Sequence, residues 1–171
     1  MKINTDYFES LEILLSALQY SGLGSAIIGG GAIRDALAGK PIADIDVFYD
    51  VSEVLDVDSI YFKSKLKLEP VATVAEYDSS EFWVTHVLTT TIATLNKPIQ
   101  LIATKTAPMD WISKFPHSIS RCALGKQGLV IPVECLSDFH KKRMFVYDNP
   151  NLNEAYLNKI KSKYHDWEFL T

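Results

Sequence analysis

Two aspartates separated by one residue are the first feature of this 171-residue chain that could do chemistry. Asp44 and Asp46 lie in the stretch 44–48, DIDVF, whose alternating pattern predicts a strand. Side chains two positions apart on a strand leave the same face, so both carboxylates point one way while Ile45 points into the core. Two carboxylates on one face are typical of a site for Mg²⁺ or Mn²⁺.

Three consecutive glycines precede this pair. They follow the apolar stretch 25–28 and lead into 32–38, a predicted short helix that ends at a further glycine. Glycines let the backbone approach a bulky anion, and a helix start offers free N–H groups and the positive end of its dipole. A triphosphate suits both features. We expect the metal ligands and catalytic residues to be Asp44 and Asp46, and the nucleotide-binding residues to be Gly29, Gly30, Gly31, Arg34 and Lys40.

The charged residues of this segment each allow a second interpretation. Arg34 could contact phosphate or pair with a neighbouring carboxylate such as Asp35, and the sequence does not decide between the two. Asp35 fits a structural role, holding the turn or orienting Arg34. Lys40 could reach the nucleotide from its loop or lie in solvent. The alternative for Asp44 and Asp46 is a pair of solvated strand carboxylates.

Other phosphate and metal motifs do not fit these residues. The stretch 29–34 lacks the third glycine of GxGxxG, and no Gly-Lys-Ser/Thr follows to make a P-loop. An EF-hand is excluded because Phe48 and Tyr49 stand where a ligand and the required glycine belong. The histidines show no ligand spacing. Arg121 and Lys126 could line an acceptor groove, although nothing local supports that role.

The elements that position these residues follow from periodicity and turn signals. Apolar residues at three- and four-residue steps predict a helix over 6–20, with Asp6 as N-cap. The stretch 52–68 is compatible with a helix covering one face of a sheet. Further helices are expected at 109–115, 134–143 and 152–164, and strands at 25–28, 71–75, 84–95, 98–103, 118–124 and 129–133, the last four as two hairpins. Without strict βαβ alternation, the fold class is α+β with a mixed sheet flanked by helices.

The stretch 29–48, GGGAIRDALAGKPIADIDVF, resembles the signature of the head domain of poly(A) polymerases and tRNA CCA-adding enzymes, within the polymerase-β-like nucleotidyltransferase superfamily. The matching positions are Gly30, Gly31, Arg34, Asp35, Gly39, Asp44 and Asp46. The resemblance implies a nucleotidyltransferase palm-like fold, aspartates that bind Mg²⁺, and transfer of NMP from an NTP. It continues loosely over 99–102 and 118–145, which look similar to compact bacteriophage members of the superfamily.

Two departures from the family pattern limit what the resemblance implies. Many members carry a third carboxylate on a later strand, where this chain offers Gln100. Either two carboxylates suffice, or Asp78 or Glu81 serves, or catalysis is impaired. The chain is also too short for the helical domains with which the larger enzymes select the base and grip RNA, so neither the base nor the acceptor can be carried over.

Length and composition set the remaining expectations. The chain fits one nucleotidyltransferase head-like domain over 1–171, with 47% hydrophobic and 22% charged residues. It shows no signal peptide and no membrane span, and its two cysteines lack paired spacing, so we expect a cytoplasmic protein. A net charge of −4 argues against a dedicated nucleic-acid coat, which leaves an RNA acceptor without compositional support. The oligomeric state stays open.

The sequence thus favours an Mg²⁺-dependent nucleotidyltransferase that acts on a hydroxyl of an RNA 3′ end, a protein or a small molecule. The alternative is a catalytically weak or inactive protein of the same fold that binds a nucleotide or a macromolecular partner. Gln100 favours the alternative, whereas the complete aspartate pair and glycine turn favour the enzyme.

Overall fold

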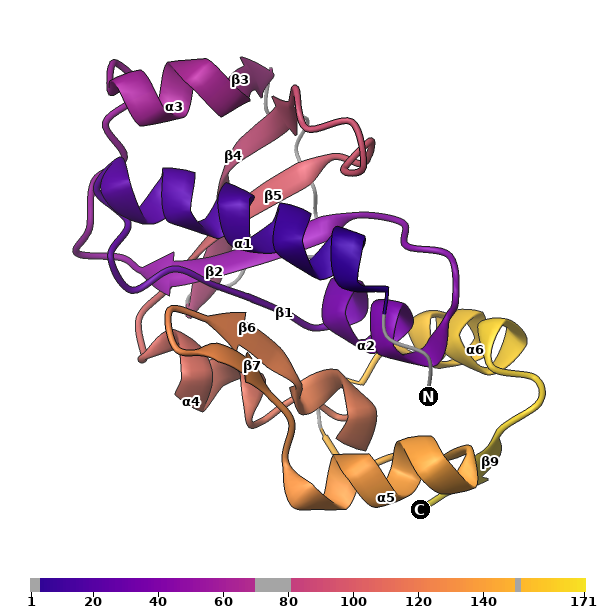
Figure 1. Cartoon of the computed structure of the whole chain (residues 1–171). Coiled ribbons are helices and arrows are strands. Elements are labelled where there is room, and N and C mark those ends of the chain that lie inside the picture. The colour runs from indigo at the N-terminus through magenta and orange to yellow at the C-terminus, as the bar shows by residue number, and fades with distance from the viewer. Residues whose placement is uncertain (1–3, 70–80, 150–151) are drawn as a thin grey trace.

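The computed structural model describes residues 4–69, 81–149 and 152–171. Its centre is a seven-stranded mixed sheet with the strand order β3-β4-β5-β2-β1-β6-β7 (Figure 1). The sheet is flanked by helices, so the α+β class and the mixed sheet are confirmed. The strands are β1 (Ile27–Gly29), β2 (Ile45–Asp50), β3 (Leu66–Glu69), β4 (Phe82–Thr90), β5 (Ile99–Thr104), β6 (Ala123–Gly125) and β7 (Gly128–Val130).

In chain order, the helices lie before, between and after these strands. They are α1 (Thr5–Tyr20), α2 (Gly31–Ala38), α3 (Ile60–Lys65), α4 (Pro108–Ile112), the 3₁₀ helix η2 (Ser118–Arg121), α5 (Val133–Lys141) and α6 (Glu154–Lys163). Two short strands, β8 (Arg143–Phe145) and β9 (Glu168–Leu170), form a separate parallel pair. No helix in the described ranges combines the length and the apolar character that crossing a bilayer requires.

The strand pairing brings distant segments together. The central pair, β2 and β5, is parallel, whereas the other neighbours in the large sheet are antiparallel. The two expected hairpins, β4–β5 and β6–β7, are both present. Strand β2, which carries Asp46, therefore lies directly beside β5, which begins more than fifty residues later in the sequence.

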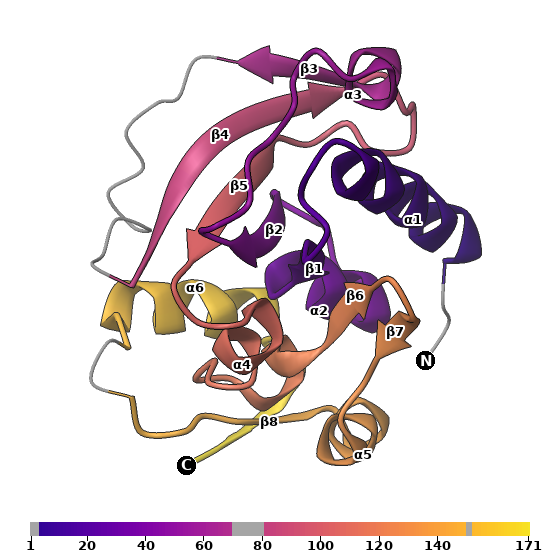
Figure 2. The ribbon, with the colours of Figure 1, turned by 90° about the vertical axis from the view of Figure 1, so that its left-hand side faces the viewer.

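The two faces of the sheet are covered by different helices. Helices α1 and α2 pack with Val47 and Leu101 in the larger hydrophobic core. Helix α4 packs on the other face against Phe48 and Ile102. Figure 2 shows α1 and α4 on opposite sides of the central strands. Because alternate strand residues face opposite sides, Asp46 shares the α4 face with Phe48.

The N-cap of helix α1 lies two residues before the expected one. Asn4, and not Asp6, is the N-cap, because its Oδ1 accepts a hydrogen bond of 3.2 Å from the Tyr7 N–H. Asp6 lies in the first turn instead, where its charge suits the positive end of the helix dipole. The buried apolar side chains of α1 recur at the expected helical steps, so its packing face was predicted even though its cap was not.

Three other expectations differ from the structure, and a fourth is not tested by it. The stretch 52–68 holds only the short helix α3 and the start of β3, and not one long helix. The strand expected at 84–95 ends at Thr90. Residues 118–121 form a 3₁₀ helix, so the strand of the second hairpin begins only at Ala123. The strand expected at 71–75 lies outside the described residues.

Candidate active site

The aspartate motif lies in the middle of a row of residues that crosses the sheet. Asp46 on β2 pairs in register with Gly29 on β1 and with Gln100 on β5. Residues in register on adjacent strands share a face of the sheet. Asp44 lies two residues earlier, immediately before β2 begins at Ile45. The pairing therefore brings the glycine turn, both aspartates and Gln100 to one place on the α4 face.

The side chain of Asp46 is buried in the sheet. The residue is 6% exposed, and its Oδ1 has no partner among the described residues. Burial, together with the negative charge of Asp44, raises the pKa of Asp46 to about 8, while the positive charge of Arg34 opposes the rise. A cation bound beside Asp46 would offset both the cost of burying its charge and the repulsion from Asp44.

Gln100 occupies the place where a third carboxylate was sought. Its Oε1 is also buried without a partner in the described part of the chain, so two acceptor oxygens lie on adjacent strands with no donor between them. No group of three His, Cys, Asp or Glu side chains that could hold a metal occurs within the described ranges. The third position next to the aspartates is thus an amide, which can ligate a cation but adds no negative charge.

Of the two acidic candidates for the missing carboxylate, only Glu81 lies within the described residues. Glu81 is described, and its carbonyl accepts a hydrogen bond from the Lys105 N–H at the opposite end of β5 from Gln100. Five residues along a strand span roughly 16 Å. Glu81 therefore does not complete the aspartate pair, and Asp78 lies outside the described residues.

The turn at Gly30 brings the start of α2 against the aspartates. Gly30 has a φ of 64° and a ψ of −131°, a conformation that favours glycine. A Cβ at this position would lie 3.1 Å from Phe115 Cε2 and 4.0 Å from Asp46 Oδ2. No side chain caps the N-terminus of α2, so its first N–H groups remain available to an anion.

Apolar side chains of α4 and the residues just after it line one side of the site. The ring of Phe115, just after α4, packs edge-on against Phe48 at a centroid distance of 5.7 Å. Ile112 of α4 fills the space where Gly29 would carry a side chain, since a Cβ there would lie 2.3 Å from Ile112 Cδ1. Phe115 carries no sequence signal for this role, because no local pattern relates a residue after α4 to the glycine turn.

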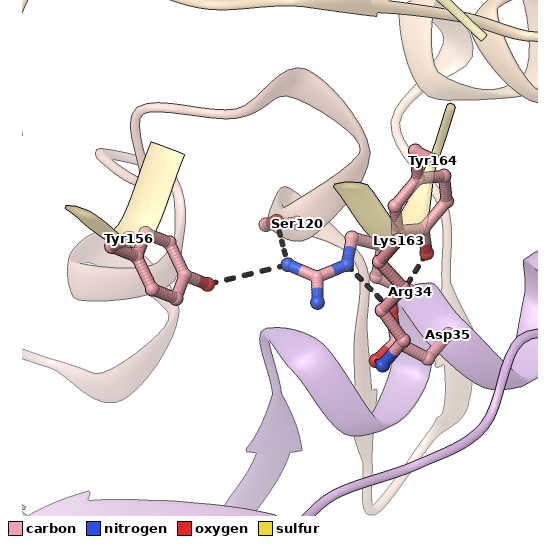
Figure 3. Close-up of polar contacts among 6 residues, drawn as sticks. All are labelled: Arg34, Asp35, Ser120, Tyr156, Lys163 and Tyr164. Atoms are coloured by element: carbon pink, nitrogen blue, oxygen red, sulfur yellow. Dashed lines mark hydrogen bonds and ion pairs between the residues drawn. The ribbon is translucent and has the colours of Figure 1, made fainter. Parts of the chain in front are cut away.

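The side chain of Arg34 is buried in a hydrogen-bonded network (Figure 3). Its Nε donates to Asp35 Oδ1 at 2.7 Å, and its Nη1 donates to Ser120 Oγ at 3.1 Å and to Tyr156 Oη at 3.4 Å. Of the two interpretations open for Arg34, the structure shows the pairing with Asp35. The charge of Arg34 still acts on the site, because it lowers the pKa of Asp46 against the effect of burial.

Asp35 connects α2 to the C-terminal helix α6. Its Oδ1 accepts hydrogen bonds from Arg34 Nε and, at 2.6 Å, from Tyr164 Oη, while its Oδ2 accepts one from Lys163 Nζ. Figure 3 shows these groups converging on the carboxylate. The structural role expected for Asp35 is thus visible, but its partners on α6 lie more than 120 residues away and carried no sequence signal.

Lys40 lies beyond the opposite end of α2 from the glycine turn. Its Nζ forms an ion pair of 2.7 Å with Asp166 Oδ1, and the side chain is 20% exposed. The eight residues of α2 span roughly 12 Å. The structure therefore brings together the three glycines and the two aspartates, places Arg34 behind them, and places Lys40 apart from them.

The architecture is similar to solved structures of tRNA-processing enzymes. The Thermotoga maritima CCA-adding enzyme complexed with tRNA matches with a TM-score of 0.60 and 14% identity, over 100% of this chain and 43% of that chain. A CCA-adding enzyme in complex with CTP matches with a TM-score of 0.54 and 13% identity, over 100% of this chain and 44% of that chain. A tRNA-processing enzyme in an apo form matches with a TM-score of 0.50 and 17% identity, over 85% of this chain and 38% of that chain.

This chain spans less than half the length of these neighbours. It matches no protein-family model and no curated protein by sequence. At such low identities the similarity concerns the fold and leaves the activity to be argued from the site. The chain has the nucleotidyltransferase fold that the CCA-adding enzymes share.

Proposed function

We propose that this protein transfers a nucleoside monophosphate from an NTP to a hydroxyl group and releases pyrophosphate. The observation that carries the proposal is the row of Gly29, Asp46 and Gln100 in register on three adjacent strands, with Asp44 immediately before β2. Carboxylates beside an uncapped helix start suit a triphosphate that carries a divalent cation. A neighbour of the same fold was solved with CTP and another with tRNA, which supports a nucleotide substrate and an RNA acceptor.

The donor atoms of the site fit Mg²⁺ or Mn²⁺. Asp46 Oδ1 and Gln100 Oε1 are buried acceptors without donors in the described residues, and oxygen ligands are those that hard cations prefer. Asp44 and Asp46 would hold the ion, and the amide oxygen of Gln100 would be a neutral third ligand. Bound there, the ion would supply charge neutralisation for the triphosphate and favour ionisation of the acceptor hydroxyl.

The residues around the aspartates have separate roles in this proposal. Gly30 and Gly31 leave room for phosphate oxygens at the start of α2, whose N–H groups donate to them. Because Gly29 has no side chain, Ile112 of α4 can pack against it on the apolar side of the site. Arg34 supports the negative charge of Asp46 from behind the turn. Lys40 takes no part, because Asp166 holds its ammonium beyond the other end of α2.

The test is transfer of label from each α-labelled NTP, with Mg²⁺ or Mn²⁺, to three separate pools of RNA, protein and small-molecule acceptors. We expect transfer to one pool, which identifies the acceptor class, and loss of that transfer with a chelator or in the variant Asp44→Ala, Asp46→Ala. Asp50→Asn is the matched control, since Asp50 lies on the same face of β2 as Asp46 but is only half-buried and lies at the other end of the strand.

A second candidate function rests on Gln100. A site with one amide in place of a third carboxylate has less negative charge to hold two cations, so the protein could bind a nucleotide or a macromolecular partner without turnover. Absence of transfer above the double variant in every pool, together with Mg²⁺-dependent binding of an NTP, would favour this function. Gain of transfer in Gln100→Glu or Gln100→Asp would then show which group had limited the chemistry.

A further inference from the structure

Arg121 differs from the other two arginines of the chain. Arg34 is paired with Asp35 and Arg143 with Asp138, each at a distance below 3 Å. Within the described residues Arg121 forms no ion pair with a carboxylate, although its side chain is only partly exposed. A guanidinium without a counter-charge in such a position gains from an anionic ligand.

The guanidinium of Arg121 is held in place on two sides. Its Nε donates a hydrogen bond of 2.9 Å to the carbonyl of Phe115, and its Cζ lies 3.9 Å from the ring centroid of Tyr147. The backbone of Tyr147 is held by a 2.7 Å hydrogen bond from its N–H to the Pro116 carbonyl. A side chain immobilised in this way loses little further entropy when it binds.

Phe115 links the held guanidinium to the proposed active site. The same Phe115 whose carbonyl accepts from Arg121 has its ring 3.1 Å from the Cβ position at Gly30, which is also 4.0 Å from Asp46 Oδ2. Within the described part of the chain, Nη1 and Nη2 of Arg121 donate to no protein group. These two terminal groups can bind two oxygens of one phosphate.

We propose that Arg121, stacked on Tyr147, binds a phosphate group of the substrate through Nη1 and Nη2. This inference rests on the proposed function, because it names a residue that positions the substrate of that reaction. The phosphate belongs either to the triphosphate of the NTP or to the phosphodiester backbone of a nucleic-acid acceptor. Both present the same paired anionic oxygens to a guanidinium, so separate probes must distinguish them.

Binding measurements test the proposal without depending on turnover. Titration calorimetry compares wild type, Arg121→Gln and Arg121→Lys with two probes: α,β-methylene-ATP in Mg²⁺, and a short single-stranded RNA. We expect Arg121→Gln to weaken one probe roughly tenfold to a hundredfold, as loss of a charge-assisted hydrogen bond does. Arg121→Lys keeps the charge but loses the paired donors, so its affinity should be intermediate. For RNA, the slope of log affinity against log salt should also fall by about 0.7.

Lys126→Gln is the matched charge control. It removes one positive charge from the β6–β7 turn, which faces α1 on the other side of the sheet, and should leave both affinities unchanged. Tyr147→Leu removes the stack but not the charge, and should weaken the same probe that Arg121→Gln weakens. If thermal melting shows that Arg121→Gln does not fold, Tyr147→Leu tests the proposal in its place.

The outcomes separate this inference from the proposed function. Equal affinities and salt slopes in wild type and Arg121→Gln would overturn the role of Arg121 while leaving the aspartate site intact. Equal weakening by Arg121→Gln and Lys126→Gln would also overturn it, because the effect would then come from net charge. Failure of wild type to bind either probe would overturn both the inference and the proposed function.

Discussion

Asp46 occupies an ordinary strand position on β2, where its Oδ1 is buried and accepts no hydrogen bond from the described residues. Burial and the neighbouring Asp44 raise its pKa to about 8, well above the usual range for an aspartate. An unfolded chain releases this proton near pH 4, so folding without a cation becomes less favourable as the pH rises from about 4 to 8. The protein retains a destabilising group at this position, which is typical of functional sites.

The variant Asp46→Asn separates this effect from binding. Without metal at pH 8 we expect it to be more stable than wild type by roughly 1 to 3 kcal/mol, because no buried carboxylate has to be left unsatisfied. Mg²⁺ should raise the melting temperature of wild type and of Asp50→Asn, but not that of Asp46→Asn. Thermal melting with and without Mg²⁺ measures both. Equal Mg²⁺ stabilisation of wild type and Asp46→Asn would refute the assignment of Asp46 as a metal ligand.

His117 should make stability depend on pH in the opposite direction. It is buried against Tyr156, its Nε2 has no partner within the described residues, and burial followed by the charge of Arg34 lowers its pKa to about 4. Between pH 6.5 and 4 the unfolded chain binds a proton that the folded protein rejects, so stability falls as the pH falls, by about 3 kcal/mol at most.

Urea unfolding at pH 7 and pH 4.5 measures the contribution of His117. His117→Gln should lose less stability than wild type over this interval, whereas the exposed His165→Gln should behave as wild type. If His117→Gln showed the same acid dependence as wild type, other groups would have to account for it.

At the scale of elements, helix α2 is bounded by two glycines with positive φ, only one of which lies in the β1–α2 turn. Gly30 and Gly39 have φ values of 64° and 67° at the two ends of α2. A Cβ at Gly39 would meet nothing within 4 Å, whereas one at Gly30 would press on Phe115 beside Asp46. Both positions carry a backbone cost for alanine, but only Gly30 borders the site.

A pair of alanine variants tests this difference. Gly39→Ala should lower stability by about 1 kcal/mol, the usual cost of a left-handed alanine, and leave nucleotide binding unchanged. Gly30→Ala should lower stability by at least as much and also weaken the binding of α,β-methylene-ATP more than tenfold. Urea unfolding and titration calorimetry give the two values. Equal nucleotide affinity in the two variants would mean that the turn at Gly30 shapes the backbone but does not bind the nucleotide.

At the scale of the whole molecule, the sequence predicted what local chemistry determines. The glycine turn, α2 with its end at Gly39, and the strand with Asp46 all follow from residues within twenty positions of one another. The place of Gln100 beside Asp46 was expected from the family resemblance, and the parallel β2–β5 pairing shows it. Local signals could not reveal the packing of Phe115 on the turn, because α4 is placed by the core of the sheet.

The C-terminal segment is the largest part of the fold that the sequence left unplaced. Helix α6 was expected, but its position against α2 depends on Asp35, which binds Lys163 and Tyr164 from across the chain. Ile160 of α6 and Tyr164, directly after the helix, belong to the same hydrophobic core as α1 and α2. Local periodicity gives the apolar face of such a helix but not the surface that it covers.

Asp35→Asn tests whether this contact joins the C-terminal segment to the sheet. Asp35 is 2% exposed, and its loss leaves the buried guanidinium of Arg34 without a counter-charge, so we expect stability to fall by roughly 3 to 5 kcal/mol. Asp166→Asn, which removes ion pairs to Lys40 and Lys142 at the surface, should cost less than about 1 kcal/mol. Urea unfolding gives both values.

Tryptophan fluorescence can follow the two regions separately in these variants. Trp167 lies in the C-terminal segment, in edge contact with Tyr164, and Trp83 lies on β4 in the large sheet. Replacing the other tryptophans by phenylalanine leaves one reporter at a time. Because α6 shares its core with α1 and α2, both reporters should show one common transition in wild type and, at lower urea, in Asp35→Asn. A Trp167 transition that preceded the Trp83 transition in wild type would show that α6 is a separately unfolding unit.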